Sequence, residues 1–172
     1  MPNSNIPNQP KQTKRELARL KRLGNAALRS IKAGLEAQHQ GSTNGLTEVM
    51  LELGFEDTSY GNGQAFIHKQ DGYVFKLAYL VGHKMPLMAI PTWSKKTKLG
   101  QVLVQPQADT SATALREFAQ ATTWATKKYM LNRHWRNRTA DYLTRKGINH
   151  LGRDCHEDNC GMYKGNPVVF DW

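Results

Sequence analysis

The chain has 172 residues, of which 39% are hydrophobic, and its formal net charge is +10. This is enough apolar material for one hydrophobic core, and the length predicts one domain with an appendage. No apolar run reaches the length of a membrane span, and the first residues lack the charged-then-apolar build of a signal peptide. We therefore expect a cytoplasmic protein that does not enter membranes.

Residues 1–45 are predicted to form a disordered lead, a basic amphipathic helical arm and a linker. Residues 1–12 are rich in Asn, Pro and Gln. From Thr13 onward, apolar residues recur at three- and four-residue steps, the spacing of one helix face. The sequence Thr13-x-x-Glu16 is a capping-box signal at the start of this helix. Gly24 is a candidate break that would divide the helix in two.

The charge of the chain is concentrated in this arm. Residues 1–45 hold eight Lys/Arg against two Glu, which gives +6 and leaves +4 for the rest. Three interpretations stay open. The helix packs its apolar face on the domain, or it binds nucleic acid or an acidic protein, or it rests on an anionic membrane, although it has no Trp or Phe anchor. The basic residues expected to contact a partner are Arg15, Arg19, Arg22, Arg29 and Lys32.

Residues 46–109 carry short helix and strand signals. A short helix is expected at 47–53. Gly61-Asn62-Gly63 lies between two strand-like runs, and Asp71-Gly72 is a strong hairpin signal. The following run, 74–78, is apolar except for Lys76. A lysine in such a strand either has an anionic partner or points to the opposite face from its apolar neighbours.

The second half is expected to begin with strands and then become helical. Strands are predicted at 85–92 and 101–105, joined by 94–100. A helix beginning at Thr110 or Ser111 keeps apolar spacing to about Asn132, and a second runs roughly from 135 to 146 and ends at Gly147.

The last residues of the chain include several side chains that can transfer protons or bind a metal ion. A polar loop offers Asp154, His156 and Asn159, and a tight turn at 164–166 then leads into an apolar run that ends at Asp171. A hairpin here would bring Asp171 beside Asn159, and an amide and a carboxylate together form a plausible Mg²⁺ site. Asp154 is then available as a base. The simplest alternative is that these polar residues only cap and turn a surface loop.

Two other interpretations use the same loop. Cys155 and Cys160 with His156 between them suggest zinc, but a closed site needs a second pair of ligands. A His-metal nuclease would use His150, His156 and Asn159, and this leaves the glycine loop and Lys76 unexplained.

Arg153-Asp154-x4-Asn159 resembles the catalytic loop of the protein-kinase-like superfamily. Asp154-x-His156-x-x-Asn159, followed by Asp171-Trp172, is similar to the aminoglycoside and choline kinase branch. The short linker after Lys76 resembles small, divergent phage kinases that modify host proteins. The resemblance implies an α+β, truncated kinase-like fold, with a small antiparallel five-stranded N-lobe at 46–109 and a reduced helical C-lobe at 110–172.

The resemblance also implies roles for individual residues. ATP would contact the backbone of the glycine loop, the lysine of the third strand and the hinge, and Mg²⁺ would be held by the loop amide and the later carboxylate. The implied cofactor-binding residues are Gly61, Gly63, Phe66, Lys76 and Gln105, the implied catalytic residues are Asp154, Lys76 and His156, and the implied metal ligands are Asn159 and Asp171.

Three departures bear on activity. No Glu follows Lys76 to pair with it, Gly152 stands where protein kinases have a His, and no substrate-binding helices follow Trp172. We therefore expect an ATP- and Mg²⁺-dependent phosphotransferase acting on a protein Ser/Thr or a small molecule, in the host cytoplasm if the chain is phage-encoded. The alternative is a degenerate kinase-like binding module that engages a host protein or nucleic acid through its basic arm.

Overall fold

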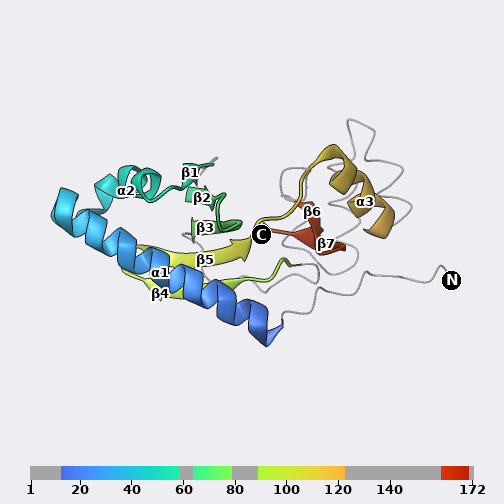
Figure 1. The fold of residues 1–172 in the computed structure, drawn as a ribbon, viewed down its shortest axis with the longest axis horizontal. Helices are drawn as coiled ribbons and strands as arrows, with labels where there is room; N and C mark the ends of the chain where they lie inside the picture. The colour runs from blue at the N-terminus through green and yellow to red at the C-terminus, as the bar shows by residue number, and fades with distance from the viewer. Residues whose placement is uncertain (1–12, 59–63, 79–88, 123–159, 171–172) are drawn as a thin grey trace. The chain divides into compact units, whose positions relative to one another are not determined.

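The computed structural model describes residues 13–58, 64–78, 89–122 and 160–170, and these form an α+β fold (Figure 1). Its elements are α1 (Lys14–His39), the 3-10 helix η1 (Thr43–Gly45), α2 (Leu46–Glu52), β1 (Glu56–Asp57), β2 (Gln64–His68), β3 (Tyr73–Ala78), β4 (Trp93–Thr97), β5 (Gly100–Pro106), α3 (Ala112–Thr122), β6 (Cys160–Tyr163) and β7 (Asn166–Val169).

The described residues belong to two compact units. The sheet unit holds residues 13–58, 64–78 and 91–107, and therefore contains α1, α2 and β1 to β5. The hairpin unit holds residues 89–90, 108–122 and 160–170, and therefore contains α3, β6 and β7. The expected lead at 1–12 and the expected helix at 135–146 lie outside the described residues.

Helix α1 begins where the capping signal places it. The Thr13 side chain accepts a hydrogen bond from the Glu16 backbone N–H at 3.1 Å, which satisfies one of the free donors of the first turn. The helix is continuous through Gly24, so the expected break there is wrong. A Cβ at Gly24 would lie 2.3 Å from Cζ3 of Trp93. Gly24 is therefore needed for the close approach of α1 to β4.

The sheet unit contains a five-stranded antiparallel sheet in the order β1-β2-β3-β5-β4. The predicted hairpin at Asp71-Gly72 is confirmed, since β2 and β3 pair directly and Gly72 has a φ of 63°. The predicted helix at 47–53 is confirmed within one residue as α2.

Strand β4 lies later in the chain than the strand that the sequence predicts at 85–92. β4 occupies Trp93–Thr97, most of the stretch expected to be a linker, and pairs with β5 from Trp93↔Val104 to Thr97↔Gly100. The polar run Ser94-Lys95-Lys96 suggests a loop, but all three side chains are exposed, and lysines are common on edge strands because they discourage pairing with a further strand. The expected strand at 85–92 falls mainly on residues outside the described ranges.

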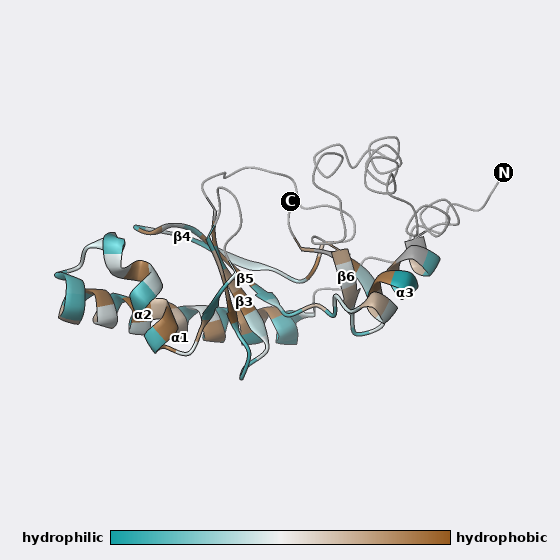
Figure 2. Ribbon diagram, turned by 90° about the horizontal axis from the view of Figure 1, so that it is seen from above, coloured by the Kyte–Doolittle hydropathy of each residue, from teal (hydrophilic) through white to brown (hydrophobic). Residues whose placement is uncertain are grey.

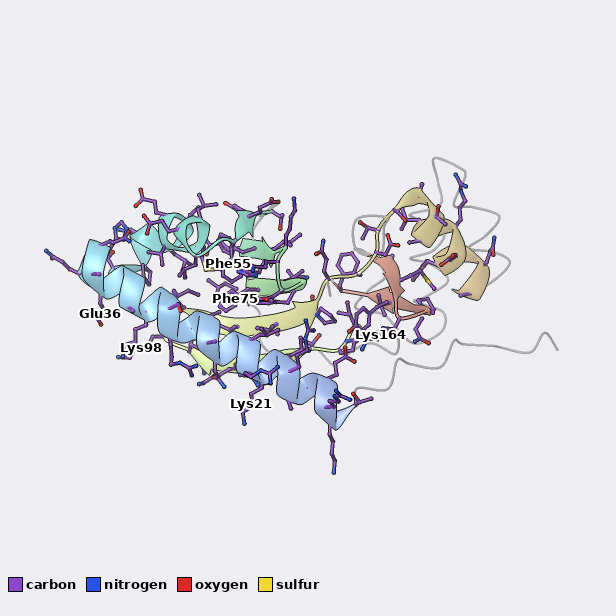
Figure 3. All side chains as sticks on the ribbon, in the orientation of Figure 1. Lys21, Glu36, Phe55, Phe75, Lys98 and Lys164 are labelled. Carbon is purple, nitrogen blue, oxygen red and sulfur yellow. The ribbon has the colours of Figure 1, made fainter. Side chains whose placement is uncertain are left out.

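The two faces of the sheet differ. Tyr73, Phe75 and Leu77 alternate along β3 and join a buried core with Val102 and Val104 of β5. Helix α1 covers this core face, with its own buried residues Leu20, Ala27, Ile31 and Leu35. Figure 2 shows hydrophobic residues along α1 and in the strands, and Figure 3 places Phe55 and Phe75 between helices and sheet. The apolar face of the arm therefore packs on the domain, which confirms the first of the three interpretations for this face of the helix.

The hairpin unit is built on local turn chemistry. Lys164 and Gly165 both have positive φ, 49° and 75°, as a two-residue type I′ turn requires. β6 and β7 consequently pair from Tyr163↔Asn166 to Cys160↔Val169, which confirms the predicted hairpin. Helix α3 packs against both strands and buries Ala114 and Phe118. The helix begins at Ala112, one residue after the later of the two expected starts, and Ser111 caps it by accepting a hydrogen bond from the Ala114 N–H at 3.2 Å. The rest of the expected helix, from 123 to 132, lies outside the described residues.

Among the described residues, no helix is both long and apolar enough to cross a membrane.

Candidate functional site

Lys76 lies at the centre of the sheet face opposite α1. It pairs with Ala65 of β2 and Leu103 of β5, and its neighbour Phe75 is fully buried in the core. Because successive side chains of a strand point to opposite faces, Lys76 lies on the face away from that core. Val74 and Leu103 share this face, and all three residues are partly exposed. The structure thus places the predicted lysine on the third strand, among apolar residues.

The segment with Gly61 and Gly63 connects two paired strands. Residues 59–63 lie outside the described ranges, but the strands on both sides of them are described. β1 and β2 are antiparallel, and the Thr58 N–H donates to the Ala65 carbonyl at 2.8 Å. The glycines therefore occupy a β1–β2 connection, and β2 lies beside the lysine-bearing strand.

Phe66 belongs to the core. It pairs with Phe75, is fully buried, and contributes to the cluster beneath α1. Ala65, one residue earlier, pairs with Lys76 instead. Alternation therefore puts Phe66 on the opposite face from Lys76. The structure gives Phe66 a packing role and brings Ala65 to the lysine.

Gln105 is a strand residue with a buried side chain. It lies in β5 opposite Val74, one residue before the strand ends at Pro106. Its side chain is 1% exposed, and its Nε2 donates to Oγ1 of Thr92 at 3.1 Å. Its Oε1 is buried without a hydrogen-bond partner among the described residues. Because a buried amide oxygen without a hydrogen bond is energetically unfavourable, a donor that bonds to this Oε1 would stabilise it.

The metal-ligand candidates flank the β6–β7 hairpin in sequence. Asn159 precedes Cys160 and Asp171 follows Val169 by two positions, and the structure pairs Cys160 with Val169 at the open end of the hairpin. Asp154, His156, Asn159 and Asp171 themselves lie outside the described residues, as do Cys155 and His150. Within the described ranges, no group of three or more His, Cys, Asp or Glu side chains is arranged to hold a metal ion.

A strand-like bridge joins the hairpin to the segment before α3. The Asp109 N–H donates to the Met162 carbonyl at 2.8 Å, and the Met162 N–H donates to the Asp109 carbonyl at 2.9 Å. Gly161 makes this approach possible, because a Cβ there would lie 2.5 Å from the Asp109 carbonyl oxygen. Gly161 lies inside a strand, where no turn requires a glycine, and its presence in the sequence therefore indicates a close backbone contact of this kind.

Among the residues that the structure describes, Tyr73 and Asp109 have shifted pKa values. Burial raises the pKa of Tyr73 to about 12, and the nearby Asp71 carboxylate adds to the rise. Hydrogen bonds from the Ser111 backbone and side chain hold the pKa of Asp109 below its ordinary value. Both arrangements stabilise local structure: Tyr73 stacks on His68 with ring centroids 5.4 Å apart, and Asp109 orders the turn that precedes α3.

The basic residues of α1 fall into two groups. Arg15, Arg22, Arg29 and Lys32 are exposed. Arg19 is partly buried, and its Nη2 donates to the Asp71 carbonyl at 2.8 Å, which ties α1 to the β2–β3 turn. Arg19 is therefore a structural contact, whereas the other four present their charge to solvent.

No protein-family model, no curated protein and no solved structure matches this chain.

Proposed function

We propose that the protein is an ATP- and Mg²⁺-dependent phosphotransferase with a kinase-like site. The observation that carries the proposal is the position of Lys76, on the third strand of an antiparallel sheet whose first two strands are joined by the glycine-containing segment. A lysine on the third strand beneath a glycine-rich β1–β2 loop is the arrangement by which protein kinases bind nucleotide phosphates. The kinase-like fold itself is part of this proposal.

The described residues fit a nucleotide in two respects. Lys76 is a cation set among apolar side chains, where an anionic ligand is attracted more strongly than in open water. Gln105 contributes a buried Oε1 that can accept a hydrogen bond from an amino group such as that of adenine. Gln105 of β5 pairs with Val74 of β3. Val74 is two positions from Lys76 on the same strand, which is a distance of about 7 Å along β3.

The remaining roles rest on the sequence resemblance. Gly61 and Gly63 would offer backbone N–H groups to phosphate, and Asn159 with Asp171 would hold Mg²⁺, which neutralises phosphate oxygens when bound. Asp154 would accept the proton of the acceptor hydroxyl, with His156 in the same loop. The acceptor is a protein Ser/Thr or a small molecule.

Nucleotide binding tests the proposal directly. A ligand that binds only the folded state raises its stability, by about 2.7 kcal/mol at a concentration of one hundred times Kd. For a chain of this size that corresponds to a rise of roughly 5–10 °C in Tm. We expect this rise with ATP and Mg²⁺ in the wild type and its loss in Lys76→Met and in Asp171→Asn.

Matched variants separate the roles. Lys69→Met removes a lysine from the exposed β2–β3 turn, where Lys69 pairs with Glu56 at 2.8 Å, and should leave the ATP-dependent rise intact. Asp154→Ala should retain the rise and lose transfer of labelled γ-phosphate to any acceptor. The absence of a shift in the wild type at millimolar ATP and Mg²⁺ would refute the nucleotide site, and transfer by Asp154→Ala would refute the role of Asp154.

A further inference from the structure

The outer side of α1 and the adjoining edge strand β4 together form a basic surface. Helix α1 contacts both β4 and β5, and Nζ of Lys95 on β4 donates to Oδ1 of Asn25 on α1 at 3.3 Å. Lys21 and Lys98 lie along one side of α1 in the view of Figure 3. All the cations of this surface are exposed. The basic surface consists of Lys14, Arg15, Lys21, Arg22, Arg29, Lys32, Lys95 and Lys98.

The positions of the helical cations place them on one side of α1. Arg15, Arg22 and Arg29 follow one another at seven-residue steps, which is nearly two helical turns, and Lys14 and Lys21 repeat the same step. The buried residues of α1, from Leu20 to Leu35, occupy the opposite side. The cations therefore form a band along the helix rather than a ring around it.

Few of the described acidic residues lie near this band. The carboxylates of α1 are Glu16, which is buried, and Glu36, which is exposed, follows Lys32 by about one helical turn and lies on the same side of α1 as Lys21 and Lys98 in Figure 3. The described strands β4 and β5 have no carboxylates. The close contacts between acidic and basic side chains at His39–Glu48, His68–Asp71 and Lys69–Glu56, all within the described ranges, do not involve the basic surface. Among the described residues, the eight cations of the basic surface thus exceed the one exposed carboxylate beside them, and this excess positive charge can attract an external anion.

The surface lacks the features of a protein or membrane contact. Among the described residues, the exposed large hydrophobic side chain is Leu51 on α2, outside the basic surface. Protein interfaces are centred on buried aromatic or large apolar anchors, and membrane-bound helices insert an apolar face, whereas that face of α1 is covered by the sheet. Single-stranded nucleic acid calls for exposed aromatic rings on which bases stack, and Trp93 of β4 is instead packed against the core.

We propose that the basic surface binds the phosphate backbone of a nucleic-acid duplex without reading its sequence. From Lys14 to Lys32 the band extends about 27 Å at 1.5 Å per residue, which spans roughly eight base pairs. Such contacts release counterions, and the logarithm of the binding constant then falls with the logarithm of salt concentration with a slope of about −0.9 per phosphate contact. This inference does not depend on the proposed phosphotransferase activity.

The test is fluorescence anisotropy of the full chain with a labelled 24-base-pair DNA duplex of random sequence, titrated between 50 and 200 mM NaCl. The triple variant Arg22→Gln/Arg29→Gln/Lys95→Gln should bind at least tenfold more weakly at 100 mM NaCl. Its salt slope should be smaller in magnitude by about 2–3. The matched control is Lys69→Gln/Arg116→Gln/Lys164→Gln, which removes the same charge from exposed positions elsewhere and should weaken binding less than threefold.

Several results would overturn the proposal. They are no binding of the wild type at 50 mM NaCl, equal losses in the two triple variants, tighter binding of a single strand than of the duplex, and displacement of the duplex by polyglutamate at equal charge. Circular dichroism of both variants checks the fold, and the substitutions are all at exposed positions. Equal affinity for AT-rich and GC-rich duplexes would support backbone recognition, and a preference beyond tenfold would contradict it.

Discussion

Gly24→Ala gives the sharpest test of how α1 packs on the sheet. Replacing a glycine inside a helix with alanine normally stabilises the folded state by roughly 0.5–1 kcal/mol, because glycine loses more backbone freedom on folding. Here the new methyl group would lie 2.3 Å and 2.7 Å from two ring carbons of Trp93 and 3.0 Å from Cγ2 of Val104. We therefore expect the substitution to destabilise the protein.

The magnitude follows from overpacking. Forcing one extra carbon into a packed core costs typically about 1–3 kcal/mol, and the helix-propensity gain offsets up to about 1 kcal/mol of this. The net loss should be about 1–2 kcal/mol, or roughly a 2–8 °C fall in Tm. Urea unfolding followed by far-UV circular dichroism measures it.

Two further variants make the result interpretable. Ala26→Gly, at an exposed position of α1, calibrates helix propensity and should cost about 1 kcal/mol. Trp93→Leu should be destabilising alone, but in its background Gly24→Ala should become neutral or stabilising, since the clashing ring is gone. If Gly24→Ala raises the stability of the wild type, the close approach of α1 to Trp93 is refuted.

Two other predictions concern the raised pKa of Tyr73 and the backbone bridge in the hairpin unit. The pKa of Tyr73 is about 12 in the folded state against an ordinary value of 10.0. Burial of the neutral phenol therefore stabilises the fold fully below pH 10. This stabilisation, about 3 kcal/mol, is lost as the pH rises toward 12. Tyr73→Phe should therefore lose less stability than the wild type between pH 9.5 and 11.5 in urea unfolding, and parallel losses would contradict the shift. Gly161→Ala should push its Cβ against the Asp109 carbonyl oxygen, 2.5 Å away, and so speed amide hydrogen exchange at Asp109 and Met162 at least tenfold. Unchanged exchange at both amides would refute the bridge.

Local signals in the sequence predicted the elements whose causes are local. The α1 start follows from a hydroxyl at Thr13 that can satisfy a free N–H, and both hairpins follow from turns that require positive φ, at Gly72 and at Lys164-Gly165. In each case the residues that decide the structure lie within a few positions of one another.

Features with non-local causes were missed. Gly24 looks like a helix break until Trp93, far along the chain, is known to lie against it. β4 looks like a linker because its side chains suit solvent, and only pairing with β5 makes it a strand. The side of the sheet on which Phe66 lies can, however, be predicted from the sequence. The turn at Asp71-Gly72 sets the register that pairs Phe66 with Phe75, and the alternation of side chains then places Phe66 and Lys76 on opposite faces of the sheet.

Helix α1 uses different sides for packing and for its exposed charges. Packing on the domain and binding an external polyanion are therefore compatible, since the buried residues and the exposed cations lie on different sides of one helix. The sheet covers the apolar side through Leu20 and Ile31, which removes the surface that a membrane would need. The same packing fixes the opposite side in place and brings Lys95 of β4 beside it. Charges held on a rigid helix and strand need less ordering when a ligand binds than charges on a loose tail. Folding the arm onto the sheet therefore strengthens the case for a nucleic-acid contact.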